Sequence, residues 1–298
     1  MKPRLASGSL LALFVAAGFA GVWGLQRGIN AQRDAMHQEE DEVLVRSPQL
    51  MKALTLEYGP LVADLYWTRA VQYYGGKRIA EDTNLASLWP LLDVATTLDP
   101  NLVPVYRFGA TFLSQPEPRG AGRPDLAISL LQRGIKANPE NWRLYQDLGN
   151  IYYLDQKDYA KAGQAYLDGS KIAGAAPWMK IMAARFMEKG DSRETAAMLW
   201  AEVLESSKDE RIQENARVNL ALLRTDEDIE QIDETAKQFA TRYGRPPQSI
   251  RELIQAGLLP GEPVDPTGVA YVIGKNGKAA ISQKSALFKQ QTTFRRPL

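Results

Sequence analysis

The chain has 298 residues, of which 45% are hydrophobic and 24% are charged, as in an ordinary folded protein. Lys and Arg number 36 and Asp and Glu number 35, so the chain lacks the excess positive charge that nucleic-acid binding requires. It contains no cysteine, which excludes disulfides, thiolate metal sites, a cysteine nucleophile and lipid attachment through cysteine.

An apolar segment lies near the N-terminus. Residues 5–25 are almost entirely apolar, and a helix of this length spans roughly 30 Å, the thickness of a bilayer's hydrocarbon core. Lys2 and Arg4 precede it, and positive charge favours the cytoplasmic side. We predict a single-pass transmembrane anchor over residues 1–25 in the inner (cytoplasmic) membrane of a bacterial cell, with the bulk of the chain in the periplasm.

A cleaved signal peptide is the alternative for the same segment. Gly18 and Ala20 are small residues that suit a signal-peptidase site. The apolar character continues beyond them through Trp23 and Leu25, and tryptophan is favoured at a membrane interface. This continuation favours an anchor that stays attached to the chain.

Residues 26–48 are polar and mixed in charge, which predicts a spacer. The segment contains His37, the single histidine of the chain, and the acidic run Glu39–Glu42. A metal site requires several converging ligands, whereas an isolated histidine and a run of like charges are typical of a solvated surface. The sequence therefore predicts no metal and no cofactor.

Residues 49–243 carry helical patterns of apolar residues, broken by Asp-Pro, Asn-Pro and glycine-containing loops. Ala127, Ala162 and Ala196 occupy matching places in three successive segments, 35 and 34 residues apart. Such a period predicts helix pairs that bury their apolar faces by stacking on one another.

A second register supports the same period. Gly109 and Gly149 are 40 residues apart, and the residues in excess of the 34- to 35-residue period fall in the Pro- and Gly-rich loop 114–124. We expect about five helix pairs, the last of them formed by residues 210–224 and 226–243.

The repeat resembles the tetratricopeptide repeat. The clearest unit begins at Asn141, and its matching residues are Tyr145, Leu148, Gly149, Tyr152, Ala162 and Tyr166. The small residues allow two helices to approach closely, and the aromatic ones fill the space beside the contact. The resemblance covers roughly residues 100–206 and is weaker on either side. It implies a mainly α fold, an α-solenoid that binds protein partners on the concave face of its first helices.

The resemblance also implies which side chains line that face. Carried over from Leu148 and Gly149, the predicted partner-binding residues are Tyr106, Arg143, Gln146, Asn150, Tyr153 and Lys180. Amides can pair with a peptide backbone, Arg and Lys with carboxylates, and Tyr offers rigid contact area. The alternative is that these residues are merely solvated. On the binding interpretation, Asn150→Ala with Arg143→Ala weakens partner capture without lowering the melting temperature.

The first helix of the array is unusually aromatic. Tyr66, Trp67, Tyr73 and Tyr74 lie within one predicted helix. One interpretation is a capping helix that closes the end of the solenoid. The other is a docking surface, because Trp and Tyr are favoured at interaction hot spots.

The pattern changes over residues 244–284. A short helix that ends at Gly257 is followed by two β runs around Asn276 and Gly277, which predict a β-hairpin because Asn-Gly suits a tight turn. The spacing of Asp265, Gly268 and Tyr271 resembles the C-terminal turn and strand of major type II secretion pseudopilins, over about 35 residues. We predict a small α/β module here and a disordered tail over residues 285–298.

No catalytic motif occurs in the sequence, which predicts a protein that is not an enzyme. The expected function is a membrane-anchored protein–protein interaction scaffold or assembly factor for a cell-envelope complex, with secretion or type IV pilus assembly as its context. The alternatives are a soluble periplasmic binding module released by signal cleavage and an accessory subunit of an envelope enzyme.

Overall fold

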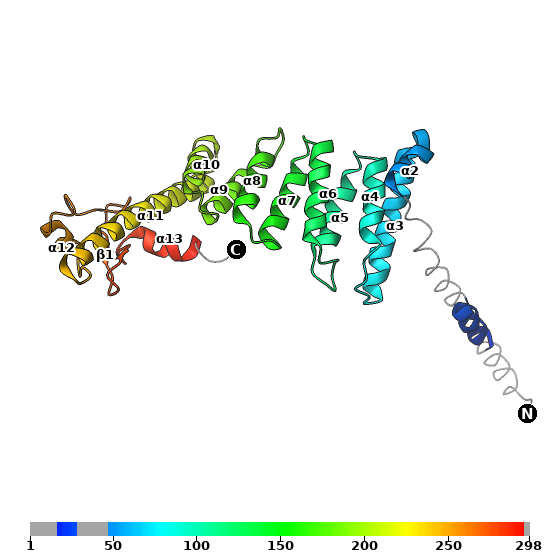
Figure 1. The fold of residues 1–298 in the computed structure, drawn as a ribbon, viewed down its shortest axis with the longest axis horizontal. Helices are drawn as coiled ribbons and strands as arrows, with labels where there is room; N and C mark the ends of the chain where they lie inside the picture. Colours follow the sequence, from blue (N-terminus) through cyan, green and yellow to red (C-terminus); the bar gives the residue numbers. More distant parts are fainter. Residues whose placement is uncertain (1–16, 29–46, 295–298) are drawn as a thin grey trace, which may run out of the picture. The chain divides into compact units, whose positions relative to one another are not determined.

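The computed structural model describes residues 17–28 and 47–294, with side chains described to residue 291 (Figure 1). His37 and Glu39–Glu42 of the predicted spacer lie outside the described residues, as do residues 1–16 of the predicted anchor. Residues 17–28 form a helix. Within the described ranges, no helix combines the length and the apolar character needed to cross a membrane.

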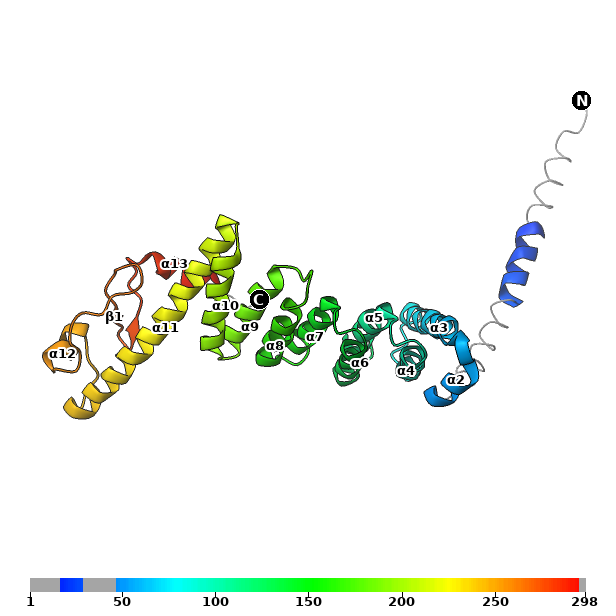
Figure 2. The same cartoon turned by 90° about the horizontal axis from the view of Figure 1, so that it is seen from above.

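The described chain is mainly helical and forms two compact units, Met1–Pro139 and Glu140–Leu298. The division falls inside the predicted repeat region. In each unit, helices that follow one another in the sequence pack side by side (Figures 1 and 2).

The array of the first unit begins at residue 48. Its elements are α2 (Pro48–Thr55), the 3-10 helix η1 (Leu56–Tyr58), α3 (Gly59–Ile79), α4 (Leu88–Leu98), α5 (Val103–Ser114) and α6 (Pro124–Ala137). Proline stands in the first turn of α2, α3, α5 and α6. The N–H groups of a first turn have no acceptor within the helix, so proline, which lacks an N–H, costs no hydrogen bond there.

The helices of the first unit pack as pairs, α3 with α4 and α5 with α6. A polar contact joins α4 to α6, because Arg133 donates hydrogen bonds to Asp93 Oδ1 at 2.5 Å and to Thr96 Oγ1 at 3.0 Å. Thr96 is buried, so this contact satisfies a polar group inside the core.

The second unit continues the pattern and then departs from it. Its elements are α7 (Trp142–Leu154), α8 (Tyr159–Ser170), α9 (Trp178–Lys189), α10 (Arg193–Ser206), α11 (Glu210–Tyr243), α12 (Ile250–Gln255), β1 (Val272–Ile273), β2 (Ala279–Ala280) and α13 (Ala286–Phe294). Side-chain caps begin three of the helices: Asn141 accepts from the Arg143 amide, Asp158 from that of Lys161 and Asp209 from that of Arg211.

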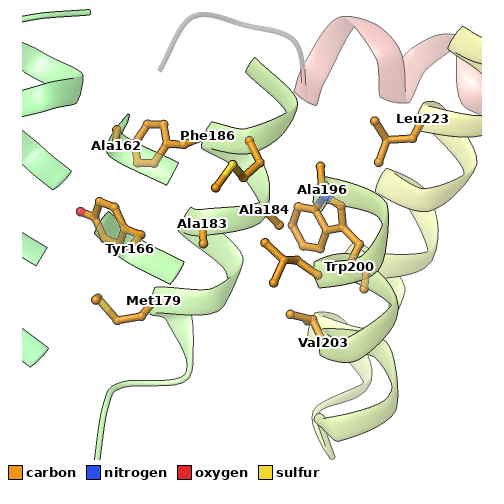
Figure 3. Packing of buried hydrophobic residues seen from close by; sticks show 13 residues of the cluster. Ala162, Tyr166, Met179, Ala183, Ala184, Phe186, Ala196, Trp200, Val203 and Leu223 are labelled. Carbon is orange, nitrogen blue, oxygen red and sulfur yellow. The ribbon is translucent and has the colours of Figure 1, made fainter. Parts of the chain in front are cut away.

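A continuous core joins α8, α9, α10 and α11. Trp200 of α10 is its largest fully buried side chain, and Figure 3 shows the indole directed toward Ala184 of α9, with Leu223 of α11 in the same cluster. The small residues Ala162, Ala183 and Ala196 are also fully buried there. The predicted repeat alanines Ala162 and Ala196 therefore lie where helices pack closely.

The predicted fifth helix pair is a single helix. Residues 210–224 and 226–243 belong to the continuous 34-residue α11. No Gly or Pro interrupts the sequence around Thr225, whose buried hydroxyl donates to the Ala221 carbonyl at 2.8 Å and so stays within the helix. Four helix pairs, α3–α4 to α9–α10, therefore precede one long helix in the described part of the chain.

The second half of α11 carries the C-terminal module. Ile232 and Phe239 of α11 pack with Leu253 of α12 and with Tyr271. β1 and β2 pair antiparallel, with Val272 opposite Ala280, and Gly277 adopts a φ of 76° in the turn between them.

The predicted disordered tail is wrong over residues 286–294, which form α13. Leu287 is buried in the core of the C-terminal module, and its amide bonds to the Ser285 hydroxyl at 3.1 Å. Contacts with α11 hold this helix, and a local sequence pattern does not reveal such contacts. Residues 295–298 lie outside the described residues.

Candidate functional site

The predicted groove residues of the second unit lie on α7 and α9, the first helices of two successive pairs. Arg143 is exposed, and its guanidinium lies 4.4 Å from the centroid of the Trp142 ring. Gln146 and Tyr153 are half-buried, and the Tyr153 ring lies 4.8 Å from the ring of Phe186. Arg143 is therefore accessible to a partner, whereas Tyr153 also packs between α7 and α9.

Asn150 has a structural role within its own helix pair. Its Oδ1 accepts a hydrogen bond of 2.7 Å from the hydroxyl of Tyr166, which is buried on α8. Burial raises the pKa of Tyr166 to about 12, so the hydroxyl keeps its proton and remains a donor. The expectation that Asn150→Ala with Arg143→Ala leaves the melting temperature unchanged does not fit this contact.

We instead expect Asn150→Ala to lower the free energy of unfolding of the second unit by about 1–2 kcal/mol, because it leaves the Tyr166 hydroxyl without its acceptor. Urea denaturation of Asn150→Ala, Tyr166→Phe and the double variant measures the coupling. In the double variant Asn150→Ala should add little to the effect of Tyr166→Phe. Strictly additive losses would contradict this role for Asn150.

Tyr106 is fully buried on α5, so the prediction that it lines the binding face is wrong. Its ring lies against Gly134 of α6, where an added Cβ would be 2.7 Å from Tyr106 Cγ. Burial raises the pKa of the Tyr106 hydroxyl to about 12. In the second unit, Tyr145 of α7 lies in the same way against Gly169 of α8, where an added Cβ would be 2.8 Å from Tyr145 Cβ.

These glycine contacts explain the error. They match Tyr106 with Tyr145, whereas the register taken from Gly109 and Gly149 matches Tyr106 with Gln146. The alignment of the two units through Gly109 and Gly149 is therefore shifted by one residue on these helices. One residue turns a helical position by about 100°, which is enough to move a side chain from the groove to the core.

Two of the four predicted docking residues of α3 have buried side chains, and the other two are half-buried. Tyr66 and Tyr74 are buried, and the Tyr74 hydroxyl donates to the Arg119 carbonyl at 2.5 Å. Tyr73 is half-buried, and its hydroxyl donates to the Asn84 carbonyl at 2.9 Å. Tyr66 and Tyr74 are thus core residues of α3, which corrects their assignment to a docking surface.

Trp67 remains half-buried, next to two aromatic residues of α5. Its ring lies 6.1 Å from that of Phe112 and 6.4 Å from that of Phe108, which is exposed. Aromatic stacking thus holds α3 against α5 and leaves one phenylalanine ring accessible.

A pocket that the sequence analysis missed lies where α9, α10 and α11 meet. Its volume is about 430 Å³, within the usual range of ligand pockets. The residues around it are Ser170, Ala175, Ala176, Pro177, Lys180, Ile181, Val203, Ser206, Ser207, Lys208, Asp209 and Ile212. The run of small residues before Pro177 was the available signal, because small side chains leave room beside a helix start.

The pocket combines apolar walls with a charged rim. Ile181, Val203 and Ile212 supply branched apolar side chains, and Lys180 forms an ion pair with Glu202 of α10. Lys208 is exposed, and no ion pair joins it to another described residue. Lys180 is thus neutralised, while Lys208 leaves positive charge at the rim.

Comparison with known protein families finds none whose sequence pattern matches the chain, and no curated protein is significantly similar to it in sequence. Within the described residues, no group of three His, Cys, Asp or Glu side chains is placed to hold a metal ion. The site is therefore defined by its own geometry, a pocket with apolar walls between three successive helices.

Proposed function

We propose that this chain is a membrane-anchored protein–protein interaction scaffold or assembly factor for a cell-envelope complex. In this proposal, the helix pairs are tetratricopeptide-type units of an α-solenoid, and a partner protein docks in the pocket between α9, α10 and α11. The single observation that carries the proposal is this pocket, which includes Lys180 of the predicted binding face.

The size and the walls of the pocket suit side chains of a protein partner. A volume of about 430 Å³ accommodates one or two side chains but not a folded domain. Ile181, Val203 and Ile212 offer apolar area to such side chains, which favours burial of an apolar residue of the partner.

The rim adds a charge preference. Lys208 is exposed and carries positive charge that no described ion pair offsets, so an acidic group beside the apolar residue would be attracted. The Ser207 hydroxyl accepts from the Asp209 amide and can donate to a partner's carbonyl or carboxylate, whereas the Ser206 hydroxyl already donates to the Glu202 carbonyl at 2.7 Å. We therefore propose a partner segment in which an apolar residue neighbours an acidic one.

The proposed location rests on the N-terminal sequence. The apolar run 5–25 and the preceding Lys2 and Arg4 support an inner-membrane anchor with the array in the periplasm. The resemblance of the C-terminal module to a pseudopilin element supports a secretion or type IV pilus complex as the context.

Because the chain has no cysteine, a single introduced cysteine can carry a photo-crosslinker into the pocket. Ser206→Cys places it on the exposed rim at the end of α10. In cells we expect one dominant protein adduct. Adding Lys208→Glu should reduce its yield about five- to tenfold, which corresponds to about 1–1.4 kcal/mol of lost binding.

Lys275→Glu is the matched control, because Lys275 is an exposed lysine in the C-terminal module and not at the pocket. It should leave the yield unchanged, and neither charge reversal should lower the melting temperature. An adduct whose yield is the same in both variants would contradict the proposed site.

A further inference from the structure

Helix α3 is apolar on two opposite sides. Its inner side carries the buried residues Ala63, Tyr66, Ala70 and Tyr74, and α3 packs on α4. On the outer side Leu61, Leu65 and Ile79 are 60%, 63% and 88% exposed, and Tyr58 just before the helix is 71% exposed. α2 packs mainly on α4 and leaves these side chains exposed, and an exposed apolar side of this kind indicates an interaction surface.

The exposed residues follow a regular spacing. The outer stripe begins at Tyr58, the last residue of η1, and continues along α3. It consists of Tyr58, Leu61, Leu65, Thr68, Gln72, Gly75 and Ile79, which are separated alternately by three and four residues. This spacing keeps the positions on one face, as in a helix seam that packs along a second, nearly parallel helix, with apolar residues at its two ends and Thr68, Gln72 and Gly75 between them. The stripe therefore fits a helix as its occupant.

The polar members of the stripe point to a second copy of the same helix. None of the seven positions carries a charge. Thr68 and Gln72 each offer both a donor and an acceptor, so either can hydrogen-bond to its own counterpart. A two-fold axis parallel to the helix brings each position to its own copy, and charged residues there would repel one another.

Two glycines add an independent observation. Gly75 and Gly76 lie within the helical turns of α3, where glycine weakens a helix. A Cβ added at either position would meet nothing within 4 Å in the chain itself. Packing within one chain therefore does not require these glycines, whereas close approach of a second helix would.

We propose that two copies of this chain associate through the outer stripes of their α3 helices, aligned in parallel across a two-fold axis. The parallel arrangement places the beginning of both arrays at the same end. This arrangement suits two chains anchored in one membrane, although the inference does not depend on the anchor or on the proposed pocket.

Disulfide formation in cells tests both the contact and its direction, because the full-length chain has no native cysteine. Tyr58→Cys, Leu65→Cys and Ile79→Cys should each give a disulfide-linked dimer under mild oxidation, at least about tenfold above Met198→Cys. Met198 on α10 is a matched control, because it is 61% exposed and lies outside the stripe.

Adding Leu65→Glu to the Tyr58→Cys chain should abolish the dimer, whereas Met198→Glu should not. Thermal melting of both glutamate variants checks that the fold is intact. Dimer yields no greater than that of Met198→Cys would overturn the proposal. Cross-linking only between Tyr58→Cys and Ile79→Cys chains would show an antiparallel pair, and adducts only with another protein would show a different partner. Either outcome also overturns it.

Discussion

Replacing Trp200 with alanine is expected to lower the free energy of unfolding of the second unit by about 3–5 kcal/mol. Trp200 is fully buried and contributes to the core between α9, α10 and α11 (Figure 3). Truncation removes its apolar contacts and leaves a cavity that the surrounding helices fill only in part. Urea denaturation followed by far-ultraviolet circular dichroism measures the loss.

Two further variants separate volume from polarity at this site. No described residue accepts a hydrogen bond from the buried Trp200 Nε1, so Trp200→Phe removes no such bond and should lose less stability than the alanine variant. Trp178→Ala, at a position 41% exposed, should lose about 1 kcal/mol or less. A loss below about 1 kcal/mol in Trp200→Ala would contradict the central place of this side chain.

Replacing Asp265 with alanine is expected to destabilise the C-terminal module by about 2–4 kcal/mol. Asp265 is 3% exposed, and its Oδ1 accepts from the Thr267 hydroxyl at 2.6 Å, the Thr267 amide at 2.8 Å and the Val269 amide at 3.1 Å. Alanine leaves these donors without their acceptor. Amide hydrogen exchange of residues 250–281 measures the change locally, and Glu262→Ala, at an exposed position, is the control that should show none.

The same contacts give a dependence on pH. Burial alone raises the pKa of Asp265, but the neighbouring Ser285 hydroxyl and the hydrogen bonds from Thr267 and Val269 outweigh it and hold the pKa below the ordinary value of 3.8. Because the folded state binds the proton less readily, this stability is present above about pH 4 and is lost as the pH falls below it. The difference between the wild-type chain and Asp265→Asn should therefore shrink between pH 5 and pH 2. A constant difference would contradict the assignment.

The helical character of the array could be predicted from the sequence because its signals are local. Asn141, Asp158 and Asp209 accept hydrogen bonds from amides in the first turn of their helices, and such caps are visible in the sequence. The close approach at Gly149 also follows from a single small residue, since an added Cβ would lie 2.6 Å from the Tyr166 ring. Each of these features needs only a few neighbouring residues.

The errors arose where contacts between distant residues decide the structure. The continuity of α11 depends on packing against α10 and the C-terminal module, and α13 is held by contacts with α11. The burial of Tyr106 depends on its contact with Gly134, and periodicity did not resolve that one-residue difference. The pocket at Ile181, Val203 and Ile212 is the space between three helices, so no single segment encodes it.

Amide hydrogen exchange of the full-length chain, alone and bound to the partner captured from cells, tests the central claim most directly. The proposed docking site predicts that the partner slows exchange in residues 175–181 and 203–212, which line the pocket, and leaves residues 124–137 of α6 unchanged. Protection confined to the C-terminal module, with no change around Ile181 and Ile212, would contradict it.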